Sequence, residues 1–173
     1  MNILIVYGST EGQTRKIAGY LKTEAEKSGH QVTLVDSTNH PPGPEGFDVV
    51  LIGASLHMHK YQTAVLHYIK ENAEALNKIT SGFFSVSLAA ASSEDESLKE
   101  LDKITNDFLK ETGWKPIDTE QVKGALLFTK YDFFKKLVMR MIAKRSGETD
   151  TTDDHEYTDW AKVKAFLDRM LKT

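Results

Sequence analysis

Short apolar runs alternate with longer amphipathic segments along most of this chain. A continuous apolar run, such as positions 3–6, is typical of a strand that is buried on both faces of a parallel sheet. Apolar residues spaced three or four apart, such as Ile17, Leu21 and Ala25, predict a helix that buries one face. The pattern predicts strands at 3–7, 31–35, 47–53, 83–88 and 122–128, and helices at 14–28, 62–78, 93–111, 132–145 and 158–171.

The regular alternation of strands and helices predicts an α/β fold, with a parallel sheet that is covered by helices on both faces. Local signals agree with the helix ends. Gly29 and Gly113 are typical C-terminal stops. Ser93 with Glu96 forms a capping box, and Thr158 is a typical N-cap. The pattern fits a doubly wound, five-stranded parallel sheet with the strand order 2-1-3-4-5.

The composition is that of a globular protein, with 173 residues, 40% hydrophobic and 27% charged. We expect a single domain over residues 1–173, with a helical insertion at about 129–157 before the last helix. The chain has no cysteine, which excludes disulfides, thiolate catalysis and cysteine-ligated iron–sulfur clusters. It shows no signal-peptide pattern and no apolar run that approaches the roughly 18 residues needed to span a bilayer. We therefore expect a cytoplasmic protein that is not integral to a membrane.

The polar loop after the first predicted strand has the composition of an anion site. Backbone N–H groups of the loop and of the following helical turn converge there, and the helix dipole favours negative charge. The loop lacks the lysine of a nucleotide-triphosphate loop and the glycine spacing of a dinucleotide fingerprint. An ordinary turn with a Ser or Thr cap is the alternative. We expect one terminal phosphate to be bound by Ser9, Thr10, Glu11, Gly12, Gln13 and Thr14.

The spacing S-T-x-G-x-T directly after the first strand resembles the FMN phosphate loop of the flavodoxin family. In a doubly wound fold, ligands bind beyond the carboxyl ends of the strands where the strand order reverses. The loops after the third and fourth strands are then expected to flank a flavin ring. The cofactor-contact residues expected in these loops are Ala54, Ser55, Leu56, His57, Tyr61, Ser87, Leu88, Ala89, Ala90 and Ala91.

The loop after the third strand carries the candidate proton-transfer groups, His57, His59 and Tyr61. No general base is assigned among them. Two histidines two residues apart can also bind a metal, but no third ligand is visible nearby, so we expect no metal site. A solvent-exposed loop with incidental histidines is the remaining interpretation.

The insertion contains an amphipathic and basic segment. The segment from Lys130 to Arg145 contains six basic residues and one acidic residue, Asp132. Its net charge is therefore +5, on a chain whose total is −3. Such a helix can lie on an anionic membrane surface, cover a hydrophobic substrate or pack on the domain as ordinary core. Nucleic acid fits poorly because the remainder of the chain is acidic. The residues expected to contact membrane or substrate are Phe133, Phe134, Lys135, Lys136, Leu137, Arg140 and Met141.

Two further motifs, S-G-E-T-D-T at 146–151 and Y-T-D-W at 157–160, resemble the C-terminal part of the menaquinone-dependent protoporphyrinogen oxidases. These are flavodoxin-like enzymes of haem synthesis with a long insertion in this place. The resemblance continues in Glu-Gly-Gln-Thr-Arg at 11–15, Ile-Gly-Ala-Ser at 52–55, Phe-Ser-Val at 84–86, Trp-Lys-Pro at 114–116 and Gly-Ala-Leu at 124–126.

The resemblance implies a reaction and a location. Protoporphyrinogen IX is oxidised in three two-electron steps through FMN, and the electrons pass to a membrane quinone, menaquinone or ubiquinone. The protein is then cytoplasmic and peripherally associated with the inner face of the cell membrane. One departure concerns position 59, where the family commonly has glycine and this chain has His59. A histidine is expected to resist the positive φ that glycine adopts easily.

Three alternatives stay open from the sequence. A flavodoxin-type electron carrier would stabilise a one-electron semiquinone. An FMN-dependent NAD(P)H:quinone reductase would be bleached rapidly by a nicotinamide cofactor. A flavin-free binding domain would be colourless and would not take up FMN.

Overall fold

In the computed structural model, residues 1–126 and 155–172 are described. The sheet is parallel and five-stranded, in the order β2-β1-β3-β4-β5, which confirms the predicted order. Its strands are β1 (Asn2–Gly8), β2 (Gln31–Asp36), β3 (Val49–Ser55), β4 (Thr80–Ser87) and β5 (Asp118–Lys123). The helices are α1 (Gln13–Lys27), α2 (Thr63–Leu76), α3 (Asp95–Thr112) and α5 (Trp160–Leu171), with a 3₁₀ turn η1 (Ala89–Ala91).

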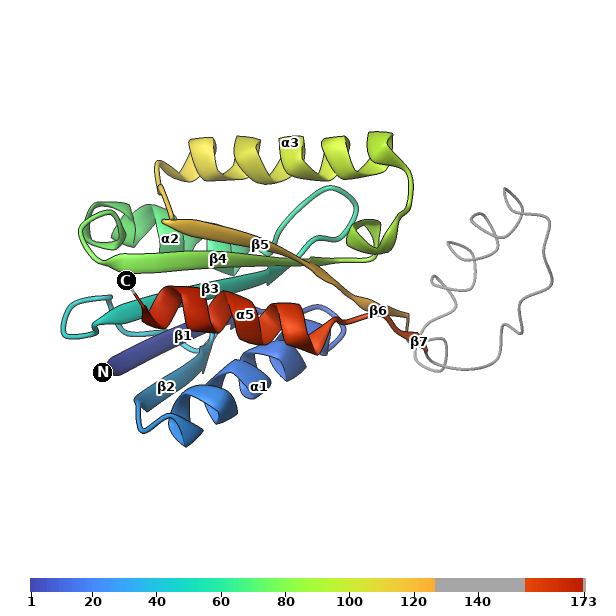
Figure 1. Ribbon diagram of the computed structural model, residues 1–173. Helices are drawn as coiled ribbons and strands as arrows, with labels where there is room; N and C mark the ends of the chain where they lie inside the picture. Colours follow the sequence, from blue (N-terminus) through green and yellow to red (C-terminus); the bar gives the residue numbers. More distant parts are fainter. Residues whose placement is uncertain (127–154, 173) are drawn as a thin grey trace.

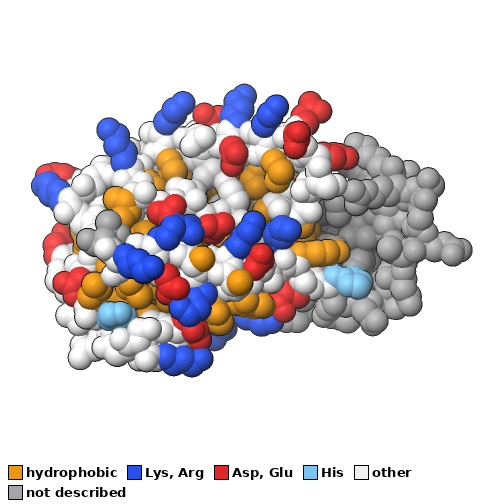
Figure 2. All heavy atoms as spheres, viewed as in Figure 1, with side chains coloured by type: hydrophobic (Ala, Val, Ile, Leu, Met, Phe, Trp, Pro, Cys, Tyr) orange, Lys and Arg blue, Asp and Glu red, His pale blue; other side chains and the backbone are white. Residues whose placement is uncertain are grey.

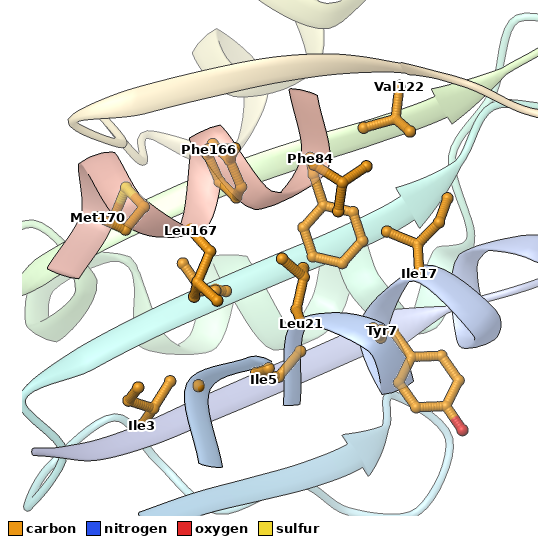
Figure 3. Close-up of a cluster of buried hydrophobic side chains, with 14 of the residues drawn as sticks. Ile3, Ile5, Tyr7, Ile17, Leu21, Phe84, Val122, Phe166, Leu167 and Met170 are labelled. Atoms are coloured by element: carbon orange, nitrogen blue, oxygen red, sulfur yellow. The ribbon is translucent and has the colours of Figure 1, made fainter. Parts of the chain in front are cut away.

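The helices form a layer on each face of the sheet. Helices α1 and α5 cover one face, and α2 and α3 cover the other (Figure 1). Successive residues of β1 point to opposite faces of the sheet and belong to two separate hydrophobic clusters. Ile3 and Ile5 pack with α1 and α5 in the first cluster, whereas Leu4 and Val6 pack with α2 and α3 in the second. This arrangement explains the continuous apolar run in the sequence. Figure 3 shows the first of the two clusters between the sheet, α1 and α5.

The fifth strand differs from its prediction. It spans Asp118–Lys123 rather than 122–128, because it lies at the sheet edge and is largely polar. Arg169 of α5 pairs with two of its acids, at 2.7 Å from Asp118 and 2.8 Å from Glu120. The chain then leaves the sheet at Gly124 and forms β6 (Ala125–Leu126), which pairs antiparallel with β7 (His155–Glu156). We call this two-stranded unit the β6–β7 ribbon.

Two predicted helix caps are also wrong. Asp159 caps α5, since its Oδ1 accepts a hydrogen bond from the Lys162 N–H at 3.1 Å. The Thr158 hydroxyl instead donates to the Lys123 carbonyl at 2.7 Å. Helix α3 begins at Asp95, with Glu94 rather than Ser93 at the N-cap.

The face that carries α1 and α5 has a mixed electrostatic surface. Figure 2 shows Lys, Arg, Asp and Glu side chains interspersed over its described part. Several of them form ion pairs, such as Lys164 with Asp168 at 2.8 Å. None of the helices in the described ranges is long and apolar enough to cross a bilayer. The predicted helix at 132–145 and its seven contact residues, Phe133 to Met141, lie outside the described residues.

Candidate functional site

The loops after β1, β3 and β4 lie together at one end of the sheet, because the carboxyl ends of these parallel strands coincide (Figure 1). Polar contacts join the first two loops. The Thr10 N–H donates to the Ser55 Oγ at 3.3 Å, and the amide of Gln62 donates to the Thr10 Oγ1 at 2.9 Å and to the Ser55 hydroxyl. The Leu56 N–H donates to the Val86 carbonyl at 2.8 Å, which ties the second loop to β4.

The loop after β1 turns into α1 at Gly12. This residue is the N-cap of α1 and has a φ of 98°, in the left-handed region that favours glycine. Its N–H donates to the Ser9 Oγ at 2.9 Å, which holds the loop in its curved form. The N–H groups of Gln13, Thr14 and Arg15 begin the helix and have no acceptors within it. The loop therefore presents several donors at the positive end of a helix.

Thr14 supplies the most specific observation. Its side chain is fully buried, and its Oγ1 has no hydrogen-bond partner among the described residues. A buried hydroxyl without a partner costs free energy, so proteins keep such groups satisfied by another group or by a ligand. Because Thr14 lies in the first turn of α1, an anion bound to the loop would satisfy this hydroxyl. The geometry fits a phosphate group.

The Gln13 side chain is directed to a different part of the protein. Its Nε2 donates to the Glu156 Oε1 at 2.7 Å and to the Thr158 Oγ1 at 2.8 Å. The sequence indicated Gln13 as a phosphate ligand, but its amide is occupied by these contacts. Its backbone N–H remains in the first turn of α1.

The loop after β3 closes in a two-residue turn at Met58 and His59. The His57 N–H donates a hydrogen bond to the Lys60 carbonyl at 3.0 Å, and the Lys60 N–H donates one to the His57 carbonyl, also at 3.0 Å. Both central residues have positive φ, 47° for Met58 and 64° for His59. This is the pattern of a type I′ turn. His59 thus adopts the positive φ that a histidine is expected to resist, and the two hydrogen bonds hold it there.

The two loop histidines face different carboxylates. His57 Nδ1 lies 3.8 Å from the Glu11 Oε1 of the phosphate loop, and His59 Nδ1 lies 3.7 Å from the Glu100 Oε1 of α3. Within the described ranges, no group of three or more His, Cys, Asp or Glu residues is arranged to hold a metal ion. The pair from His57 to Glu11 spans the loops after β1 and β3.

The side chain of Tyr61 is partly buried and packs against the core. Its hydroxyl bonds to the Ser85 Oγ and to the Thr105 Oγ1, both at 2.8 Å, and its ring centroid lies 4.5 Å from that of Phe108. Burial raises the pKa of the Tyr61 phenol, against a smaller opposing effect of the two hydrogen bonds. A phenol with a raised pKa stays protonated at neutral pH and therefore cannot accept a proton. The structure therefore favours His57 and His59 over Tyr61 among the three candidates.

The loop after β4 is closed by its own hydrogen bonds. The Ala90 N–H donates to the Ser87 Oγ at 3.1 Å, and the Ala91 N–H donates to the Leu88 carbonyl at 2.9 Å. The Gly124 N–H donates to the Ser87 carbonyl at 2.9 Å. A Cβ at position 124 would lie 3.2 Å from the Ser87 carbonyl carbon, so glycine permits this close approach. The start of the β6–β7 ribbon therefore lies against this loop.

Glu11 gives a prediction about pH. Burial raises the pKa of its carboxyl group, so the folded state binds the proton more tightly than the unfolded state does. The stability that this proton contributes is fully present below the unfolded pKa of about 4.5 and is lost as the pH rises through the folded pKa. We expect Glu11→Gln to raise the melting temperature of the ligand-free protein at pH 7, but not at pH 4. Thermal unfolding at both pH values tests this.

Glu74→Gln is the control for this prediction. The hydrogen bond from Lys78 lowers the pKa of the exposed Glu74. Its stabilising effect is present above the unfolded pKa and is lost as the pH falls through the folded pKa, so the sign is opposite and the effect small. Equal responses of the two variants would contradict the assignment of Glu11 as a partly buried carboxylate with a raised pKa.

Comparisons with known proteins identify the family of this chain. The family model of the flavodoxin domain matches residues 4–153. A protoporphyrinogen IX dehydrogenase (quinone) of Escherichia coli (strain K12) is 34% identical over 168 residues, which are 96% of this chain and 92% of that protein. A protein of the same name from Leishmania major is 32% identical over 168 residues, 94% of this chain and 71% of the other.

A solved structure agrees with the fold. Oxidised flavodoxin 1 from Bacillus cereus superposes with a TM-score of 0.51 at 14% identity, covering 87% of this chain and 100% of the flavodoxin. At this identity the likeness concerns the arrangement of the sheet and helices alone.

Proposed function

This chain belongs to the flavodoxin domain family and, within it, to the quinone-dependent protoporphyrinogen IX dehydrogenases, and we propose that it oxidises protoporphyrinogen IX to protoporphyrin IX through bound FMN, with a quinone as electron acceptor. The observation that carries the FMN part is the buried, unpartnered hydroxyl of Thr14 at the start of α1. The substrate and acceptor are those in the names of the two relatives.

The phosphate of FMN would be held by the loop after β1. The first N–H groups of α1 and the hydroxyls of Thr10 and Thr14 are its donors, and Gly12 leaves room for the phosphate because no atom lies within 4 Å of its Cβ position. The Ser9 hydroxyl shapes the loop by accepting the Gly12 N–H. A lysine-free loop of this kind suits a single phosphate.

The flavin ring would lie between the loops after β3 and β4, at 54–61 and 87–91. Bound FMN supplies the redox chemistry, two electrons at a time. The protein orients the ring through the Met58–His59 turn, which two backbone hydrogen bonds fix. His57 and His59 are the candidates to accept the N–H protons of the substrate. Tyr61 would act from the interior, by anchoring the end of the loop to Ser85 and Thr105.

A membrane quinone as the electron acceptor supports a reaction at a membrane surface. The charge of +5 between Lys130 and Arg145 supports peripheral contact with anionic lipid, on the inner face of the cell membrane. Sedimentation with vesicles tests this part. The protein is expected to bind vesicles that contain anionic lipid and to dissociate at high salt, whereas equal binding to neutral vesicles would argue against it.

Replacing Thr14 by valine separates ligand binding from folding. The two side chains have nearly the same shape, so the ligand-free protein should be at least as stable as wild type, because a buried unpartnered hydroxyl is removed. The loss of one hydrogen bond to a charged phosphate should raise the dissociation constant for FMN by about 10- to 100-fold. Flavin fluorescence titration measures the affinity, and thermal unfolding of the apoprotein measures the stability. Unchanged FMN affinity would contradict the assignment of Thr14.

The reaction itself is tested under anaerobic conditions. FMN-loaded protein is mixed with protoporphyrinogen IX, with and without a soluble menaquinone analogue, and porphyrin fluorescence is followed. Many turnovers that require both flavin and quinone are expected. A long-lived semiquinone without porphyrin would instead indicate an electron carrier, and rapid bleaching by NADH or NADPH would indicate a quinone reductase.

A further inference from the structure

The β6–β7 ribbon contacts the phosphate loop, and we propose that Glu156 and Thr158 are positioning residues of the FMN site, which fix Gln13 and the first turn of α1. The inference rests on the proposed binding of FMN. It extends that proposal to two residues more than 140 positions away from the phosphate loop in the sequence.

Glu156 is the centre of the contact with α1. Its carboxylate accepts the Gln13 amide at 2.7 Å and both of its oxygens lie 2.9 Å from the Lys16 Nζ. The first turn of α1 contains no acidic residue of its own. Glu156 therefore provides, from a distant part of the chain, the carboxylate that helix N-termini favour. Lys16 balances its charge, so the phosphate site gains no net negative charge from the pair.

The pKa of Glu156 agrees with this geometry. Partial burial raises the pKa of the Glu156 carboxyl group. The hydrogen bonds from Lys16 and Gln13, together with the Lys16 charge, outweigh this effect, so the pKa lies below its ordinary value. The groups that face the carboxylate from α1 are thus the ammonium of Lys16 and the amide of Gln13. The contact is formed at neutral pH.

Thr158 joins the same amide to the sheet. Its Oγ1 accepts a hydrogen bond from Gln13 at 2.8 Å and donates to the Lys123 carbonyl at the end of β5 at 2.7 Å. The neighbouring Tyr157 N–H donates to the Gly124 carbonyl at 3.1 Å, and Gly124 contacts Ser87 of the β4 loop. The ribbon and its flanks therefore contact both the phosphate loop and the loop after β4.

The residues that follow hold α5 against the same end of α1. The Trp160 ring lies 4.8 Å from the Tyr20 ring, measured between centroids, and the Lys16 Nζ lies 5.4 Å from the centroid of Trp160. Lys16 thus contacts both Glu156 and Trp160. Residues of the Y-T-D-W motif therefore have structural contacts. Tyr157 bonds to Gly124 just after β5, Thr158 and Trp160 contact α1, and Asp159 caps α5.

These contacts couple the ribbon to the ligand. Glu156 and Thr158 join the ribbon and its flank to Gln13, Lys16 and Lys123. If the ribbon stabilises the phosphate-binding form of the first turn of α1, then FMN must stabilise the ribbon by the same factor, since coupling between two sites is reciprocal.

Thr158→Val tests the inference without changing any charge or any residue of the phosphate loop. We expect the dissociation constant for FMN to rise about 3- to 10-fold, the usual effect of one or two neutral hydrogen bonds. Thr158→Ser, which keeps the hydroxyl, should restore binding. Thr23→Val is the matched control, because its hydroxyl also donates to a backbone carbonyl, Gly19 at 3.0 Å, on the far part of α1.

Hydrogen exchange of the Tyr157 amide provides the second measurement. FMN should slow this exchange in the wild type and in Thr158→Ser, and much less in Thr158→Val. Wild-type FMN affinity and wild-type protection in a folded Thr158→Val protein would overturn the inference and leave the proposed function intact. A wild-type protein that takes up no FMN would overturn both.

Discussion

Replacing Gly12 by aspartate should abolish FMN binding at micromolar protein, with a dissociation constant raised by about 100-fold or more. Three effects act together. The φ of 98° at this position strains any residue with a Cβ. The new side chain would occupy the space in which no atom now lies within 4 Å of the Cβ position. Its carboxylate would also repel the phosphate at the end of α1. Flavin content after reconstitution with FMN is the measurement.

Gly29→Asp is the matched control for this substitution. Gly29 follows the other end of α1, has a φ of 83°, and also has no atom within 4 Å of its Cβ position. The control therefore introduces a similar backbone strain and the same charge without a phosphate nearby. The strain costs about 1 kcal/mol in each variant. The carboxylate is less favourable in Gly29→Asp, at the negative end of the helix dipole, so the control should lose at least as much free energy of unfolding. Only Gly12→Asp should lose FMN. Full flavin content in Gly12→Asp would contradict the phosphate-loop assignment.

The strand order and the strand–loop–helix arrangement around Gly12 could be predicted because each depends on local patterns. Strands that are buried on both faces leave continuous apolar runs, such as positions 3–6, and right-handed strand–helix units restrict their order. The positive φ of Gly12 is likewise a property of one residue type in one short loop.

Other features depend on contacts between distant residues, and the sequence did not indicate them. The fifth strand was displaced in the prediction because its acids are satisfied by Arg169, which is 49 residues beyond Glu120. The contacts of the Gln13 side chain could not be foreseen, because Glu156 and Thr158 reach it across 143 and 145 residues. The sequence indicated Tyr61 as a candidate flavin contact and proton acceptor. Nothing in the local sequence indicates the hydrogen bonds of its hydroxyl with Ser85 and Thr105.

The turn at Met58 and His59 could not be predicted from residue type either. Residue type alone argues against positive φ there, but the His57 and Lys60 backbone groups form two mutual hydrogen bonds that require it. Two non-glycine residues in this region cost roughly 1–3 kcal/mol each. A cost of this size at the edge of the flavin site is consistent with a loop that is selected for its position beside the ligand.

Replacing Gly53 by alanine should have the largest effect on stability. Gly53 lies in β3 beside Phe84 of β4, and a Cβ at Gly53 would overlap the Phe84 ring. Figure 3 shows this ring in the cluster that α1 and α5 cover. Overpacking of a buried site costs about 3 kcal/mol, which lowers the melting temperature of a protein of this size by roughly 10 °C. Thermal and urea unfolding measure the change.

The cause can be isolated with two further variants. Gly19→Ala, within α1, meets no atom within 4 Å and should stabilise the protein by about 0.5–1 kcal/mol, so alanine itself is not the cause. In a Phe84→Leu background, Gly53→Ala should cost less than in the wild type, because the atoms of the ring that it would meet are absent. Equal costs in both backgrounds would mean that Gly53 is required for another reason. Because β3 leads directly into Ser55 and the loop that follows it, Gly53→Ala should also lower the FMN content of the purified protein, whereas Gly19→Ala should leave it unchanged.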